Sequence, residues 1–212
     1  MVLLAGCGGV NSYLADRQET VEMYHIFDLK TSADADIVIR AAADGLAQNT
    51  NSVKQNRPLV MGATVPATPG RFQLVDVASM LPGGMGAFAQ LAAMQSGGTP
   101  MRAAKCDGAV WTSLATRHIS GYNNLTLYNC IYAYKGGYQL DMYAVFQKTS
   151  GGVSALATGI SDALIGTPEA WVNKTILDTV RSMQKASGGT VSHLEGQPKI
   201  SDLPWADKYS VN

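Results

Sequence analysis

The chain has 212 residues, of which 46% are hydrophobic and 15% are charged. This length and apolar content suffice for one hydrophobic core and exclude a wholly disordered protein. Lysine plus arginine and aspartate plus glutamate number 16 each, without a basic cluster, so we expect no nucleic-acid partner. The sequence has no uninterrupted run of 18 apolar residues, and it predicts no transmembrane helix.

A four-residue motif stands at the N-terminus. Leu4-Ala5-Gly6-Cys7 places two small residues directly before a cysteine, as a signal peptidase requires when extended backbone enters its narrow cleft. The motif resembles the lipobox of bacterial lipoproteins, and this resemblance implies that Cys7 is lipidated. Residues 1–6 carry no positive charge and are shorter than the apolar region of about 7 to 15 residues in a signal peptide. We therefore expect that the signal begins further upstream or has been trimmed.

The lipobox resemblance also implies a location. Gly8 follows the cysteine where inner-membrane lipoproteins carry aspartate, so the expected site is the outer membrane of the bacterial cell envelope, on its periplasmic face. Several acyl chains, palmitate among them, would hold the protein stably at the membrane. Residues 8–20 are polar and aperiodic, which predicts a tether, with a short first strand as the alternative. A domain over 21–186 and a tail over 187–212 would follow.

The first half of the domain is expected to contain strands and one helix. Alternation of side chains predicts strands at 21–29 and 72–77, and an apolar run predicts another at 59–65. Residues 33–48 are interpreted as a helix that Thr31 or Ser32 caps, and 49–58 as a polar loop. The expected buried stripe of the helix consists of Ile37, Val38, Ala41, Ala42 and Leu46.

Residues 109–146 predict a three-stranded antiparallel meander, with strands at 109–119, 124–134 and 139–146. Gly136-Gly137 would form a two-residue hairpin loop, which sets Ala133 opposite Leu140 and Leu127 opposite Phe146 on an apolar face. The other face, which we call the tyrosine face, carries Tyr128, Cys130, Tyr132, Tyr134, Asp141 and Tyr143.

The C-terminal part predicts one clear helix. Thr167 is a good N-cap, and Pro168 and Glu169 suit the first turn of a helix that reaches about residue 186. Its expected buried stripe consists of Val172, Ile176, Val180 and Met183. Residues 153–165 are apolar and ambiguous, with a short helix as one reading, and the tail is expected to wrap the surface.

Cys106 and Cys130 form a possible disulfide, which the expected compartment favours and the expected strand geometry opposes. An exported protein meets an oxidising compartment, where an isolated cysteine pair is expected to be bridged. A turn at 120–123 would place Ser113 opposite Cys130, which leaves Cys106 seven residues, or more than about 20 Å, away along the strand. The bridge then requires the chain to double back at 105–108, and the sequence leaves both outcomes open.

Two surfaces are candidates for interaction. The segment 80–98 is rich in glycine, alanine and methionine, and a short helix at 87–95 would present Met85, Phe88, Leu91 and Met94. The second candidate is the tyrosine face, through Tyr128, Tyr132, Tyr134 and Tyr143. As an alternative, a second helix covers that face and leaves the rings partly buried with their hydroxyls in water.

The sequence offers no pattern of residues that points to catalysis. The three histidines, His25, His118 and His193, fall in different segments and lack ligand neighbours at metal-binding spacing. No phosphate-binding, zinc-protease or serine-hydrolase motif is present. We therefore expect no enzymatic activity, no cofactor and no metal.

The pattern as a whole predicts an α+β fold, in which helices at 33–48 and 167–186 pack on an antiparallel sheet. Paired strands closed by a C-terminal amphipathic helix resemble the PsbP/Mog1-like fold of small periplasmic lipoproteins of the DcrB type. The first functional hypothesis is a non-catalytic envelope lipoprotein that acts in protein interaction or assembly. The second is a carrier of a small apolar molecule or lipid. An exposed apolar patch would favour the first and an internal apolar cavity the second.

Overall fold

The computed structural model describes residues 17–58, 64–80, 102–118, 125–150 and 167–198. Its main element is a six-stranded antiparallel sheet with the order β2-β5-β6-β7-β1-β8. The strands of this main sheet are β1 (Arg17–Lys30), β2 (Ser52–Asn56), β5 (Trp111–Arg117), β6 (Leu125–Tyr134), β7 (Gly137–Ser150) and β8 (Thr190–Gln197). The α+β class is confirmed.

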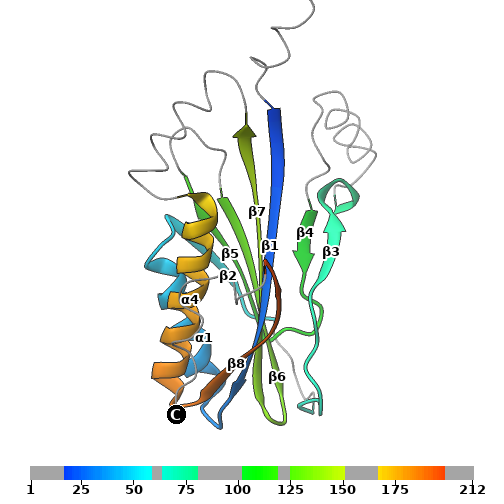
Figure 1. Cartoon of the computed structure of the whole chain (residues 1–212). Helices are drawn as coiled ribbons and strands as arrows, with labels where there is room; N and C mark the ends of the chain where they lie inside the picture. Colours follow the sequence, from blue (N-terminus) through cyan, green and yellow to red (C-terminus); the bar gives the residue numbers. More distant parts are fainter. Residues whose placement is uncertain (1–16, 59–63, 81–101, 119–124, 151–166, 199–212) are drawn as a thin grey trace, which may run out of the picture.

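The remaining elements form two further layers on the main sheet. The helices α1 (Ala35–Ala47) and α4 (Pro168–Ser187) pack against each other and cover one face of it. A separate pair of strands, β3 (Gln73–Asp76) and β4 (Arg102–Lys105), lies on the opposite side, and a single 3-10 turn follows β3 at Val77–Met80. We call this pair the small sheet. Figure 1 shows the order helices, main sheet, small sheet from left to right.

The hydrophobic core lies between the helices and the main sheet. Alternate residues of each strand point to it, and the ring of Trp111 and the side chains of Ile131 and Met142 are completely buried there. Side chains of this size contribute about 1.5–3 kcal/mol each when they leave water. The large buried strand residues in this core include Met23, Phe27, Leu29, Trp111, Leu127, Ile131, Tyr138, Leu140, Met142 and Phe146.

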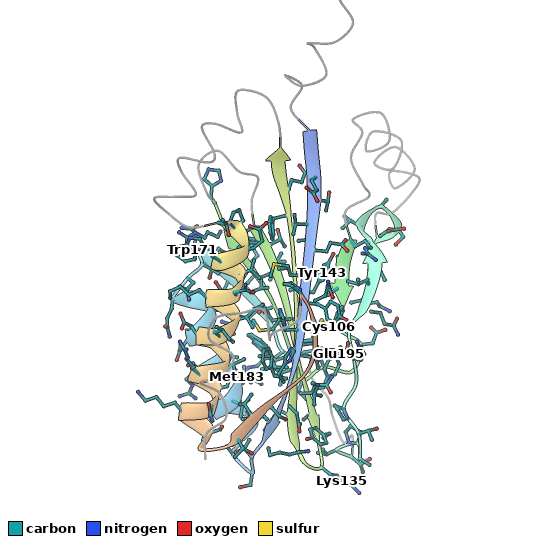
Figure 2. The ribbon with its side chains drawn as sticks, viewed as in Figure 1. Cys106, Lys135, Tyr143, Trp171, Met183 and Glu195 are labelled. Atoms are coloured by element: carbon teal, nitrogen blue, oxygen red, sulfur yellow. A yellow bond between two sulfur atoms is a disulfide. The ribbon has the colours of Figure 1, made fainter. Side chains whose placement is uncertain are left out.

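Helix α4 matches its prediction closely. The hydroxyl of Thr167 accepts a hydrogen bond from the backbone N–H of Ala170, and Pro168 opens the first turn. Gly188 ends the helix in the left-handed conformation, which glycine adopts without strain. All residues of the predicted stripe are buried: Val172, Ile176, Val180 and Met183. Met183 projects from α4 in Figure 2.

Helix α1 is also confirmed, but two details were wrong. Asp34 caps it by accepting a hydrogen bond from the N–H of Asp36 at 2.8 Å, whereas Thr31 accepts from Ala33 before the helix begins. Ile37 is 44% exposed and Ile39 takes its place in the core. The buried stripe is rotated because α1 must face α4 as well as the sheet.

The meander is confirmed, with a shift in the β6–β7 hairpin. Tyr134 pairs with Gly137, so Leu127 lies opposite Ala144 instead of Phe146. Gly137, and not Gly136, has the positive φ, and a Cβ there would collide with the carbonyl oxygen of Leu29 in β1. The shift is two residues, and because side chains alternate with period two, the apolar and tyrosine faces keep their members.

The pairing of β5 with β6 differs from the prediction by one residue. Thr112, not Ser113, lies opposite Cys130. A slip of one residue moves every side chain of a strand to the other face. Ser113 therefore belongs to the helix side of the sheet, where its hydroxyl accepts a hydrogen bond from the Asn129 amide at 3.0 Å.

Several assignments near the ends of elements were wrong. Residues 52–56 form the edge strand β2 instead of a loop, and β1 begins at Arg17, inside the predicted tether. The predicted tail contains β8, which pairs with β1 at the other edge of the sheet. Of the predicted strand 59–65, only residues 64 and 65 are described, and they are not in a strand. The reading of 153–165 lies outside the described residues.

Gly45 of α1 lies in close contact with α4, and it provides a test of their packing. A Cβ at this position would lie 2.5 Å from the Cα of Thr179. Alanine favours a helix by about 1 kcal/mol, but overpacking costs about 1–3 kcal/mol. We expect Gly45→Ala to lower the free energy of unfolding by about 1–2 kcal/mol in a denaturant titration. Asp44→Ala, at an exposed neighbouring position, is the control, and an equal effect of both would contradict the close helix contact.

Candidate functional site

The small sheet covers part of the tyrosine face. Tyr132 and Tyr143 are each 1% exposed, whereas Tyr128 and Tyr134 are half-buried. Tyr143 lies on the side of the main sheet that faces β4 (Figure 2), and its ring stacks on Phe72 with 6.1 Å between centroids. Tyr132 and Tyr143 are therefore not available as an open interaction surface. The predicted alternative, a covering layer, is closer to the structure, although the cover is a sheet and not a helix. The hydroxyls of Tyr132 and Tyr143 were expected in water and are buried instead.

Three ties hold the small sheet and its approach segment in place. Arg102 of β4 forms an ion pair with Glu22 of β1, and its Nε lies 2.8 Å from the Glu22 carboxylate. Arg71 pairs with Glu195 of β8 through its two terminal guanidinium nitrogens, Nη1 and Nη2. The third tie is the disulfide described next. Together they attach the cover at β1, β8 and β6.

Cys106 and Cys130 form a disulfide with 5.8 Å between their Cα atoms. The chain does double back: Gly108 has a positive φ of 77°, and the N–H of Ala109 donates to the carbonyl of Cys106. The strand before this turn, β4, belongs to the small sheet and does not continue β5. Cys106 is therefore not seven residues along a continuous strand from the partner of Cys130, and the predicted separation of more than about 20 Å was wrong.

Asp141 is a buried carboxyl group on the tyrosine face. It accepts hydrogen bonds from the N–H of Phe72 at 3.0 Å and from the Gln139 amide at 2.8 Å, and it is 0% exposed. Burial raises the pKa of Asp141 to about 6, although these hydrogen bonds and the nearby Arg71 guanidinium act in the opposite direction. Phe72 lies in the segment that leads into β3. Its hydrogen bond to Asp141 therefore attaches this segment to β7 of the main sheet.

A histidine pair lies at the junction of β1 and β8. Nδ1 of His25 is 3.1 Å from Nε2 of His193, and His25 is fully buried. Burial, and to a smaller extent the neighbouring His193, lower the pKa of His25 to about 4; burial also lowers the pKa of His193. Both rings are therefore neutral at pH 7, and one donates to the other. Sequence reasoning missed this contact because 168 residues separate the pair.

The open part of the tyrosine face contains a groove of about 400 Å³. Residues of β2 form one wall, the end of β4 and the following turn form the other, and β5 and β6 form the floor. Its lining consists of Lys54, Gln55, Asn56, Pro58, Ala104, Cys106, Asp107, Thr112, Ser113, Leu114 and Tyr128. We call this the β2–β4 groove. Of the four predicted tyrosines, only Tyr128 reaches it.

Several predicted site residues cannot be placed. The lipidation site Cys7 and the apolar residues Met85, Phe88, Leu91 and Met94 lie outside the described residues. Within the described ranges, no group of three or more histidine, cysteine or acidic side chains could hold a metal ion. Neither described helix, α1 or α4, has the length and apolarity to span a membrane.

The fold and the site define an α+β protein whose main sheet carries helices on one face and a disulfide-linked small sheet on the other. No protein-family model matches the chain, and no curated protein matches it. Its function must therefore be argued from its own residues.

Reduction of the disulfide tests its contribution to stability. The bridge spans 24 residues, and closing a loop of this length stabilises a fold by about 3 kcal/mol through the unfolded chain. We expect a reductant to lower the free energy of unfolding by about this amount. The control is the double variant Cys106→Ser with Cys130→Ser, which should no longer respond to reductant. An unchanged denaturation midpoint for the reduced wild-type protein would contradict this expectation.

The raised pKa of Asp141 predicts a defined pH dependence of stability. The folded state holds a proton on Asp141 up to about pH 6, whereas an unfolded aspartate releases it near its ordinary pKa of 3.8. The stability from this group is thus present below about pH 4 and is lost as the pH rises to 6. As the pH rises across this range, the free energy of unfolding of Asp141→Asn should increase relative to that of wild type by up to about 3 kcal/mol in denaturant titrations. If the free energy of unfolding of both proteins changes with pH in the same way, Asp141 does not titrate with a raised pKa. This test holds whatever the absolute stability of the variant.

Proposed function

We propose that this chain is an exported lipoprotein of the bacterial cell envelope whose α+β domain binds a partner without catalysis. Lipid on Cys7 would anchor it, in agreement with the lipobox Leu4-Ala5-Gly6-Cys7. The domain behind the anchor would stand in the periplasm and present the β2–β4 groove to its partner.

The disulfide between Cys106 and Cys130 is the observation that carries this proposal. Such bridges persist in oxidising compartments such as the periplasm and are rare in the cytosol. Cys130 is 1% exposed, and the bridge joins β6 of the main sheet to the turn after β4. The disulfide supports export on grounds independent of the N-terminal motif.

A binding role is favoured over transport of an apolar molecule. The groove has the volume of a small-molecule site, but its described lining includes Lys54, Asn56, Asp107 and Thr112. Such groups lose hydrogen bonds to water when an apolar ligand covers them. A lipid carrier would need a different, apolar cavity. In the methionine-rich segment, Met85, Phe88, Leu91 and Met94 lie outside the described residues. We also propose that the domain is similar in fold to the small periplasmic lipoproteins of the DcrB type.

Fractionation of cells that express the chain behind a complete signal peptide tests the anchor. We expect the wild-type protein to partition with outer membranes and Cys7→Ser to appear in the soluble periplasmic fraction, since several acyl chains are needed for stable attachment. Lys185→Gln, an exposed change on α4 that leaves the lipobox and the disulfide intact, is the control and should remain with the membrane. If Cys7→Ser still partitions with membrane, the lipid anchor is wrong.

A further inference from the structure

Side chains of three strands converge in the β2–β4 groove. In the observed register Lys54 lies opposite Leu114, which lies opposite Tyr128, and Asn56 lies opposite Thr112. Directly paired residues of an antiparallel sheet share a face, so all five belong to the face that the groove occupies. Gln55 and Ser113 have side chains on the other face, where Gln55 accepts a hydrogen bond from Trp111 and Ser113 accepts one from Asn129.

The groove offers hydrogen-bond donors that the described chain does not use. Lys54, Asn56, Thr112 and Tyr128 make no side-chain hydrogen bond or ion pair with any other described residue. Asp107, at the opposite wall, is different because the ammonium of Lys105 lies 2.6 Å from its carboxylate. The ammonium of Lys54 is therefore the lining charge that lacks a counter-ion within the described part of the chain.

Contacts within the protein hold the walls and floor of the groove in place. The disulfide joins Cys106 in one wall to Cys130 beneath it. The ring of Tyr128 packs beside Tyr143, with 6.0 Å between centroids. Arg57, directly after β2, forms an ion pair with Asp36 of α1 and so ties the other wall to the helix layer. A site with fixed walls loses less conformational entropy on binding than a flexible one.

We propose that the β2–β4 groove binds a small ligand through a carboxylate group, with Lys54 as its counter-ion. A carboxylate accepts several hydrogen bonds at once, which suits one ammonium group with amide and hydroxyl donors from Asn56, Thr112 and Tyr128. The Tyr128 ring and Leu114 supply an apolar surface for the carbon part of the ligand. This inference rests on the proposed binding function and specifies the chemistry of its ligand. A peptide C-terminus and a sugar acid share that chemistry.

Titration of the purified full-length chain by NMR tests the inference. The probes are N-acetyl-alanyl-alanine with its C-terminal amide as neutral control, and glucuronate with glucose as neutral control. We expect at least one acid to shift the backbone resonances of Lys54, Thr112 and Tyr128, while its neutral counterpart does not. A shift by the peptide acid alone identifies a peptide C-terminus as the ligand, and a shift by glucuronate alone identifies a sugar acid.

Two matched variants identify the counter-ion. Lys54→Gln removes the positive charge from the groove and should weaken binding of the acid about tenfold, as expected for a charge-assisted hydrogen bond. Lys185→Gln removes the same charge from an exposed position near the end of α4 and should leave binding unchanged. The inference is overturned if neither acid binds at millimolar concentration, if acid and neutral probe bind equally, or if both variants bind like wild type. These measurements need no lipid, so their failure is distinct from a failure of the Cys7 anchor.

Discussion

The pairing of β1 with β7 is the constraint on which the rest of the structure depends. It joins Arg17–Lys30 to Gly137–Ser150 without a break in register, although more than 100 residues separate the two strands. Because β1 lies inside the main sheet, β8 has a strand to pair with and His25 meets His193. The absence of a side chain at Gly137 permits this pairing to begin, because any Cβ would strike the Leu29 carbonyl.

Different interactions stabilise the two faces of the main sheet. The helix face is a large apolar core, and its stability comes from burial of side chains between α1, α4 and the strands. The tyrosine face has a much smaller apolar cluster around Ala109, Cys130 and Tyr132. A two-stranded sheet is marginal by itself, which explains why a disulfide and ion pairs to Glu22 and Glu195 fix this one. The small sheet leaves the β2 end of the face uncovered, and the groove lies there.

Only part of the candidate site could be predicted from the sequence. The composition of the tyrosine face was predictable because a hairpin shift of two residues conserves the parity of alternating side chains. The floor of the groove was not, because the observed β5–β6 register differs by one residue and brings Thr112 and Leu114 to this face. Lys54 and Asn56 were missed as well. They lie in a short polar segment whose strand conformation is imposed by β5, with no apolar alternation of its own to reveal it.

The sequence by itself determined the elements whose signals are local. The Thr167 cap, the stripe of α4, the meander and the α+β class follow from hydrogen bonding and side-chain periods within a few residues. The tertiary structure decided everything that depends on which distant segments meet: the place of β1, the edge strands β2 and β8, the histidine pair and the disulfide. Local pattern could not reveal that β4 lies outside the main sheet, because the disulfide and the ion pair that hold β4 there involve partners elsewhere in the chain.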